Sequence, residues 1–232
     1  MRKTHPTNLC RGFTLMEMAL VLVVIGLVIG GITLGRDVQR NAQYHRMLND
    51  FVQGWAIAYD SYYTGNNHPP GDTPTAPSAR VNGTTGSELC GNNLINAFLA
   101  AGVPLPQGRA EGVADRQVYQ DGNGLPHELS VCFVNESWHE PGASVGSYVL
   151  RPRNLLVLRG ATPSLARFID SSIDGQSDAA FGRVRESGLI GQTSPTSVEW
   201  SLDDRVAYGQ TTATARDESQ VAELELYFKM TR

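Results

Sequence analysis

Glu17 has the most unusual chemical setting in this sequence. It lies at the leading end of an apolar segment, and the eighteen residues from Met18 to Gly35 carry no charge. An uncharged run of this length predicts a membrane-spanning helix rather than a helix of a globular core. A carboxylate in a bilayer costs about 2.5–3.5 kcal/mol on insertion scales, so such an acid usually has a function and a partner.

The residues ahead of Glu17 form a recognisable pattern. A short basic leader ends in Arg11, a small residue follows at Gly12, and a bulky apolar residue follows at Phe13. Glu17 comes four positions after Phe13, directly before the apolar run. This pattern resembles the type III signal sequence of type IV pilins and type II secretion pseudopilins.

The resemblance implies how the chain is processed. In that family a prepilin peptidase cleaves after the glycine, here Gly12, and methylates the new N-terminal residue, here Phe13. The family's acid corresponds to Glu17. In a filament of packed helices the amine of Phe13 would be an unpaired cation, and Glu17 of a neighbouring subunit would neutralise it.

The resemblance also implies a function, a location and partners. We expect a structural subunit of a type IV pilus-like filament that inserts once in the inner membrane of a bacterium. Its N-terminus would be cytoplasmic and its globular domain outside, and it would then join an extracellular or periplasmic filament. The implied partners are other pilin or pseudopilin subunits, the prepilin peptidase and the inner-membrane assembly machinery.

Two features favour a minor subunit or a pseudopilin over a major pilin. The apolar helix has no proline, whereas many major pilins have one there. The segment Ile169-Asp170-x-x-Ile173-Asp174-Gly175 also resembles an element of minor pilin-like proteins, although the second Asp of the family's pair is missing.

Other functions remain as alternatives. The same signal occurs in pseudopilins of type II secretion systems, and the same anchor could carry a tip-located adhesin. Trp55, Trp138 and Trp200 are interpreted as core residues rather than as a sugar-binding platform. We expect no enzymatic activity, because no nucleophile–base pattern or phosphate-binding loop is found.

The charge balance argues against nucleic-acid binding. The net charge is −4, and removal of a leader with three basic and no acidic residues takes it to −7. An acidic domain binds DNA poorly, so no nucleic acid is expected as a partner.

The cysteines predict one disulfide. Cys10 lies in the leader, which leaves Cys90 and Cys132 in a chain bound for an oxidising exterior. Closing a loop of this length stabilises a fold by about 2–4 kcal/mol. Two buried free thiols are the alternative.

Three aspartates at four-residue spacing are the weak metal candidates. Carboxylates of Asp170, Asp174 and Asp178 would suit calcium, which takes six to eight oxygen ligands. Helix capping or simple solvation explains the same spacing, so we expect no cofactor.

The expected fold is α+β. Residues 1–12 form the leader, and residues 13–64 form one long helix whose part 13–35 spans the membrane and supports assembly. The second half of this helix is amphipathic, with its apolar stripe formed by Tyr44, Leu48, Phe51, Trp55, Tyr59 and Tyr62. It should pack on a small antiparallel sheet within a globular domain of residues 65–232, giving a lollipop-like molecule.

The shorter elements are predicted from hydrophobic periodicity and from the glycine and proline residues at their boundaries. Helices are expected at residues 92–101 and from Thr162-Pro163 onward. Strands are expected at residues 129–134, 148–150, 155–158, 197–202 and 221–228.

Overall fold

The computed structural model describes residues 14–110, 112–121, 124–200 and 223–231, and for residues 32–34, 36 and 37 it describes the backbone only. The chain divides into two compact units, Met1–Asn41 and Ala42–Arg232. The division falls inside the long helix, because the second part of that helix belongs to the core of the second unit.

The expected long helix is present. It consists of α1 (Leu15–Arg46), a π-helical turn η1 (Met47–Val52) and α2 (Gln53–Asn66). It ends at Asn67, which adopts the left-handed conformation (φ 58°) and donates its backbone N–H to the Tyr63 carbonyl. The wider turn η1 was not expected, because the apolar spacing is the same before and after it.

The apolar stripe of the helix is buried as predicted. Its six members are each at most 7 % exposed: Tyr44, Leu48, Phe51, Trp55, Tyr59 and Tyr62. The buried stripe confirms that the amphipathic half of the helix packs into the globular unit.

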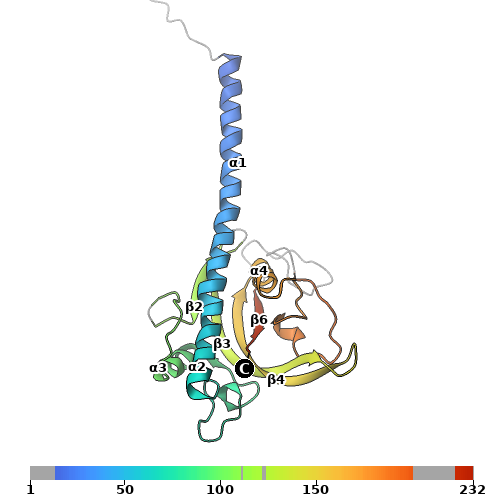
Figure 1. Cartoon of the computed structure of the whole chain (residues 1–232). Coiled ribbons are helices and arrows are strands. Elements are labelled where there is room, and N and C mark those ends of the chain that lie inside the picture. The colour runs from blue at the N-terminus through green and yellow to red at the C-terminus, as the bar shows by residue number, and fades with distance from the viewer. Residues whose placement is uncertain (1–13, 111, 122–123, 201–222, 232) are drawn as a thin grey trace, which may run out of the picture. The chain divides into compact units, whose positions relative to one another are not determined.

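One antiparallel sheet forms the other layer of this unit. Within the described residues its strands are arranged β1-β3-β4-β6-β5, and β2 also pairs with β3. Figure 1 shows β3 and β4 as the long curved pair of this sheet. The strands are β1 (Leu89–Cys90), β2 (Arg116–Gln120), β3 (Pro126–Pro141), β4 (Tyr148–Ala161), β5 (Val184–Glu186) and β6 (Leu224–Lys229). This architecture confirms the α+β class.

The strand expectations need three corrections. Residues 148–150 and 155–158 belong to a single strand, β4, because Arg151, Pro152 and Arg153 continue the pairing with β3 although they interrupt the apolar pattern. Residues 197–200 form no strand: their backbone is irregular, and Trp200 points into the core instead. Residues 201, 202, 221 and 222 lie outside the described part of the chain. The short strands β1, β2 and β5 were not expected.

Two helices complete the second unit, close to where they were expected. These are α3 (Gly91–Ala100) and α4 (Pro163–Asp174), and two short 3₁₀ turns, η2 (Val81–Gly83) and η3 (Ser187–Leu189), lie in the loops. Helix α4 begins with Pro163 after Thr162, an arrangement suited to a helix start because proline has no N–H to leave unpaired.

Aromatic rings hold the helices to the sheet. The ring centroids of Trp55 in α2 and Phe98 in α3 are 5.5 Å apart, and Phe98 and Phe133 of β3 are 5.8 Å apart. Tyr59 stacks on Phe133 at 5.2 Å. Such pairs contribute about 0.5–1.5 kcal/mol each beyond their burial, so this cluster fixes α2 and α3 on β3.

The sheet is buried on both faces. Leu129, Val131 and Phe133 of β3 join the main core with the helices, whereas Cys132 and Val134 lie in a second cluster on the other face. Because successive residues of a strand point to opposite faces, the continuous apolar run of β3 is what such two-sided burial requires.

No helix within the described residues is both long enough and apolar enough to cross a membrane. The expected span includes Phe13, which lies outside those residues, and residues 32–34, of which only the backbone is described. The span therefore stays a prediction.

Candidate functional site

Glu17 and Thr14 form a compact hydrogen-bonded pair at the start of α1. The Glu17 Oε2 atom accepts the backbone N–H of Thr14 at 2.8 Å and the Thr14 hydroxyl at 3.0 Å. The Thr14 Oγ1 atom in turn accepts the backbone N–H of Glu17 at 3.2 Å. The two residues thus satisfy each other's backbone groups.

This arrangement is a capping box. Thr14 immediately precedes the first helical residue, Leu15, and Glu17 is the third residue of the helix. The pattern Thr-x-x-Glu stabilises a helix start because its first backbone N–H groups have no partner within the helix. The sequence contains this signal, but the apolar run drew attention to the charge of Glu17 and not to its capping spacing.

The capping box leaves part of the carboxylate available. Among the described residues both hydrogen bonds go to Oε2 of Glu17, and the side chain is exposed. The positive end of the helix dipole favours an anion at this position. The carboxylate of Glu17 is therefore held in one orientation, and its Oε1 atom can accept a hydrogen bond from a further donor.

The two residues of the expected cleavage site, Gly12 and Phe13, lie outside the described residues. The cleavage between them and the methylation of Phe13 stay predictions.

The segment after Glu17 presents apolar side chains on all sides. Leu20, Leu27 and Ile29 are 64 %, 72 % and 59 % exposed, and the large apolar residues between them are exposed as well. Apolar side chains exposed in such numbers mark a surface that lipid or protein covers.

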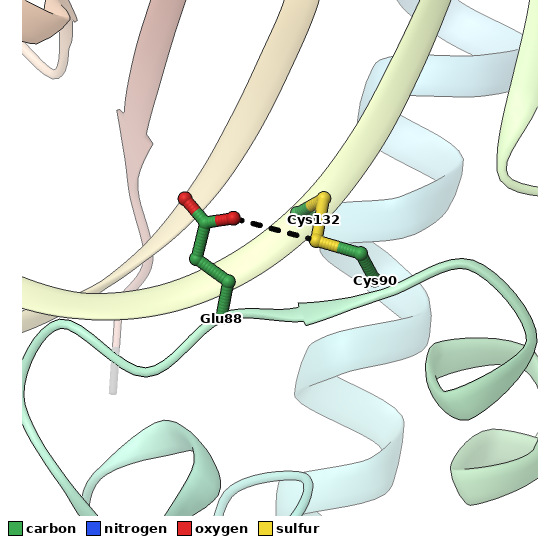
Figure 2. Close-up of side chains that lie close together, drawn as sticks. All are labelled: Glu88, Cys90 and Cys132. Carbon is green, nitrogen blue, oxygen red and sulfur yellow. Dashed lines mark hydrogen bonds between the residues drawn. A yellow bond between two sulfur atoms is a disulfide. The ribbon is translucent and has the colours of Figure 1, made fainter.

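Cys90 and Cys132 are joined by a disulfide, with their Cα atoms 4.5 Å apart. The two cysteines lie opposite each other in the pairing of β1 with β3. Figure 2 shows Glu88 beside the bond, with its Oε2 atom 3.7 Å from the Cys90 sulfur. A disulfide sulfur carries no hydrogen, so this approach is a contact and not a hydrogen bond.

Arg159 connects the disulfide to two acids. Its guanidinium donates to Glu88 and to Glu225, and its Nη1 atom lies 3.5 Å from the Cys132 sulfur. The hydrogen bond that Arg159 donates to Glu88, and then the one that it donates to Glu225, raise the pKa of Arg159. Although Glu88 and the two cysteines are close enough to surround an ion, oxidised sulfurs are not thiolate ligands, so this trio does not suit a metal.

The three aspartates do not converge as a metal-ligand set among the described residues. Asp170 is fully buried, and its Oδ2 atom accepts the indole N–H of Trp200 at 2.6 Å and the backbone N–H of Asp178 at 2.7 Å. Burial, the largest cause, and the nearby carboxylate of Asp174 raise the pKa of Asp170 to about 7. This carboxyl holds Trp200 in the core.

The other two aspartates organise the loop after α4. Asp174 Oδ2 accepts the backbone N–H groups of Arg183 at 2.7 Å and Val184 at 3.0 Å. Asp178 Oδ1 accepts the backbone N–H of Ala180 at 2.8 Å. The carboxylate oxygens thus accept backbone N–H groups of the irregular segment that leads into β5. The role of these two aspartates is therefore structural.

The tryptophans offer no binding platform. Trp55 and Trp138 are fully buried, and Trp200 is 2 % exposed. An aromatic platform for sugars needs exposed rings, so these residues do not support the adhesin alternative.

Comparison with known proteins identifies the N-terminal segment. Residues 7–33 match the family model described as the prokaryotic N-terminal methylation motif. Comparisons with curated proteins and with solved structures give no match. The matched range contains Gly12, Phe13 and Glu17 together with the capping box and the first half of α1. The chain therefore carries at residues 7–33 the N-terminal methylation motif, the signature of type IV pilins and pseudopilins.

Proposed function

We propose that this chain is a structural subunit, of the minor pilin kind, in a type IV pilus-like filament. The observation that carries the proposal is the methylation motif at residues 7–33 running directly into the exposed apolar half of α1. The motif is of the kind that a prepilin peptidase reads, and the described apolar side chains of this half of α1 are exposed. Both features suit a protein that is processed and then buried among other subunits.

The proposed assembly step uses Glu17. Cleavage after Gly12 creates a free amine at Phe13, and a charged amine among packed apolar helices is costly unless it is paired. In the structure Thr14 holds one oxygen of Glu17 and orients the carboxylate. The other oxygen is then positioned to accept a hydrogen bond from the Phe13 amine of a neighbouring subunit.

The proposed course begins in the inner membrane. The leader stays on the cytoplasmic side, the apolar half of α1 anchors the subunit, and the globular unit lies outside. The assembly machinery then transfers the helix from lipid into the filament. The globular unit needs no catalytic activity in this scheme.

Mass spectrometry of the mature N-terminus tests the processing step. We expect wild-type protein to begin with N-methylated Phe13, and Gly12→Leu to retain the leader, because a bulky residue does not fit where the motif has glycine. Gly12→Ala is the matched control, since its side chain stays small. Purified wild-type protein that retained Met1 while functioning normally would exclude the proposal.

A pair of Glu17 variants separates charge from capping. Glu17→Gln keeps the capping hydrogen bonds, since glutamine also serves at this position, whereas Glu17→Ala loses both cap and charge. If the charge pairs with Phe13, both variants should be cleaved normally and both should be incorporated into filaments at least tenfold less than wild type, a loss equivalent to about 1.4 kcal/mol. The readout is the amount of subunit in sheared filaments relative to membranes.

Normal incorporation of Glu17→Gln alongside failure of Glu17→Ala would show that the cap, and not the charge, is required.

The proteins that copurify with the mature chain complete the test. Pilus subunits support the proposal, and a set of secretion pseudopilins would assign the chain to the type II secretion pseudopilus instead.

A further inference from the structure

We propose that the open edge of β4, from Tyr148 to Arg153, is a docking surface for the same edge of a second copy of this chain. The two strands would pair antiparallel and continue one sheet across both molecules. The inference concerns the globular unit and does not depend on the processing of Gly12 or the charge of Glu17.

Strand β4 is paired along most of its length on one side and along a shorter part of it on the other. Its partner β3 covers Tyr148 through Arg159. On the opposite side β6 covers only Leu155 through Ala161. Within the described residues no strand covers β4 from Tyr148 to Arg153, although Figure 1 shows β4 as a continuous long strand.

Two hydrogen bonds show which backbone groups face this open edge. Met230 N–H donates to the Asn154 carbonyl at 3.0 Å, so the backbone of Asn154 faces the side of β6. On β3, His139 N–H donates to Ile190 and therefore points away from β4. His139 lies opposite Leu150, so the backbone of Leu150 also points away from β3. Along an antiparallel strand, the backbone groups of successive residues point alternately toward and away from the partner strand. The backbone groups of Tyr148, Leu150 and Pro152 therefore point to the open side.

The outer edge of β3 provides a contrast within the same sheet. It is covered by β2 and β1, and beyond them by single hydrogen bonds from Gly86 N–H to the Asn135 carbonyl and from His139 N–H to the Ile190 carbonyl. The described residues offer no such cover to Tyr148 and Leu150. Exposed strand edges are usually protected because they pair readily with other strands.

Exposed apolar side chains lie at this edge and in the turn that precedes it. Val149 is 39 % and Leu150 43 % exposed, and Val145 in the adjoining turn is fully exposed. The charged residues of this edge, Arg151 and Arg153, lie 3.8 Å and 2.7 Å from Glu140 and are 60 % and 40 % exposed at their side chains. Apolar side chains beside free backbone groups suit a strand that pairs with another strand.

Pro152 selects the register of a second copy. It has no N–H to donate, so pairing at the open side relies on Tyr148 and Leu150. A two-fold axis at Val149 places Tyr148 of each molecule opposite Leu150 of the other, and every N–H and C=O of these two residues is satisfied. An axis one residue further, at Leu150, would place Tyr148 opposite Pro152 and leave the Tyr148 carbonyl without a donor.

The same register is compatible with the charges. It places Arg151 opposite Ser147 of the second copy and Arg153 opposite Val145, so no like charges face each other. Like charges directly opposite destabilise a strand pair. A second copy of this chain therefore fits the edge in backbone groups, apolar side chains and charge.

Cysteine cross-linking of the full-length protein in membranes tests the pairing. At the axis the two Val149 residues form a non-hydrogen-bonded pair with Cα atoms about 4.5 Å apart, which is within the range that a disulfide bridges. Under a mild oxidant, Val149→Cys should form a reducible species of twice the subunit mass. Wild type provides the background from its own cysteines.

Val145→Cys is the matched control because it is more exposed and lies on the same hairpin. In the proposed register the two Val145 residues are far apart, at opposite ends of the paired segment. We expect Val149→Cys to cross-link severalfold more than Val145→Cys. Equal cross-linking of both would indicate random collision and overturn the proposal, as would a product formed with a different protein.

A second pair of variants tests the backbone. In the Val149→Cys protein, Leu150→Pro removes the outward N–H that the second copy needs, whereas Leu150→Ala keeps it. We expect the cross-linked dimer to be lost with Leu150→Pro and retained with Leu150→Ala, with an unchanged circular dichroism spectrum in both. Undiminished cross-linking of a folded Leu150→Pro protein would overturn the proposal. Because N-terminal processing is measured separately, failure here is distinguishable from failure of the proposed function.

Discussion

At the scale of single residues, Asp170 shows how burial changes the behaviour of a carboxyl. It is fully enclosed, binds the indole of Trp200, and lies one helical turn before Asp174. Burial and the neighbouring carboxylate both disfavour its charged form, and together they raise its pKa to about 7. The folded protein therefore keeps a proton on Asp170 that the unfolded chain releases at much lower pH.

This difference gives a stability prediction for Asp170→Asn. Between the ordinary aspartate pKa of 3.8 and about 7, the folded state binds a proton that the unfolded state has lost. The free energy of unfolding should therefore fall as pH rises through this range and level off above it. The substituted asparagine stays neutral and can still accept from Trp200, so the variant should lose much of this slope and be more stable than wild type at pH 8 by about 1–3 kcal/mol.

Urea unfolding of the full-length protein in detergent between pH 4 and pH 8 measures the effect. Asp50→Asn, which changes an exposed carboxylate, is the control for the loss of one negative charge. Some slope should remain in Asp170→Asn, because burial also raises the pKa of Glu186 to about 7. A variant less stable than wild type at pH 8 would contradict the protonated state of Asp170.

At the scale of elements, the disulfide fastens an otherwise weakly held segment. Strand β1 consists of Leu89 and Cys90 only, and its pairing with β3 is limited to these two positions. The bond joins residues 42 positions apart, so it restricts the unfolded chain considerably. The disulfide therefore stabilises the fold mainly by restricting the unfolded chain, and it also ties the short strand β1 to β3.

Replacing both cysteines by serine should lower the free energy of unfolding by about 2–4 kcal/mol, because the loop closure in the unfolded chain is lost. Denaturant unfolding of the full-length protein measures this loss. Wild type treated with a thiol reductant is the control and should lose a similar amount. A loss well below this range in both samples would show that packing of α3 alone holds the segment.

At the scale of the whole molecule, the chain contains two units with different requirements. Both hydrophobic clusters are built from residues between Tyr44 and Met230. Among its described residues, the first unit (Met1–Asn41) contributes no member to either cluster, and its described large apolar side chains are exposed. Within the described residues, the hydrophobic core therefore lies in the second unit.

A chain consisting of residues 42–232 should consequently fold alone. We expect cooperative unfolding with a free energy within about 1 kcal/mol of that of the full-length protein in detergent, because no core contact is removed. Circular dichroism during urea titration measures both. As a control, a chain that begins at residue 53 lacks Tyr44, Leu48 and Phe51 and should be destabilised by several kcal/mol. Failure of residues 42–232 to fold would show that the first unit contributes to the core.

The sequence by itself determined those features that depend on local pattern. The methylation motif, the long helix with its buried stripe from Tyr44 to Tyr62, and the start of α4 at Pro163 follow from charge, spacing and residue type in one short segment. The disulfide partners followed from counting, because Cys10 lies in the predicted leader and only Cys90 and Cys132 lie beyond it. Thr14 and Glu17 were also within reach, since the capping spacing is local.

The tertiary structure decided what depends on neighbours distant in the sequence. Arg151, Pro152 and Arg153 break the apolar pattern of β4, yet the strand continues through them because β3 supplies its partners. Trp200 was expected in a strand but is held by Asp170, thirty residues away in the chain. The short strand β1 and the open edge of β4 depend on which backbone groups have a hydrogen-bond partner in the folded chain. Residue type alone does not specify this pairing.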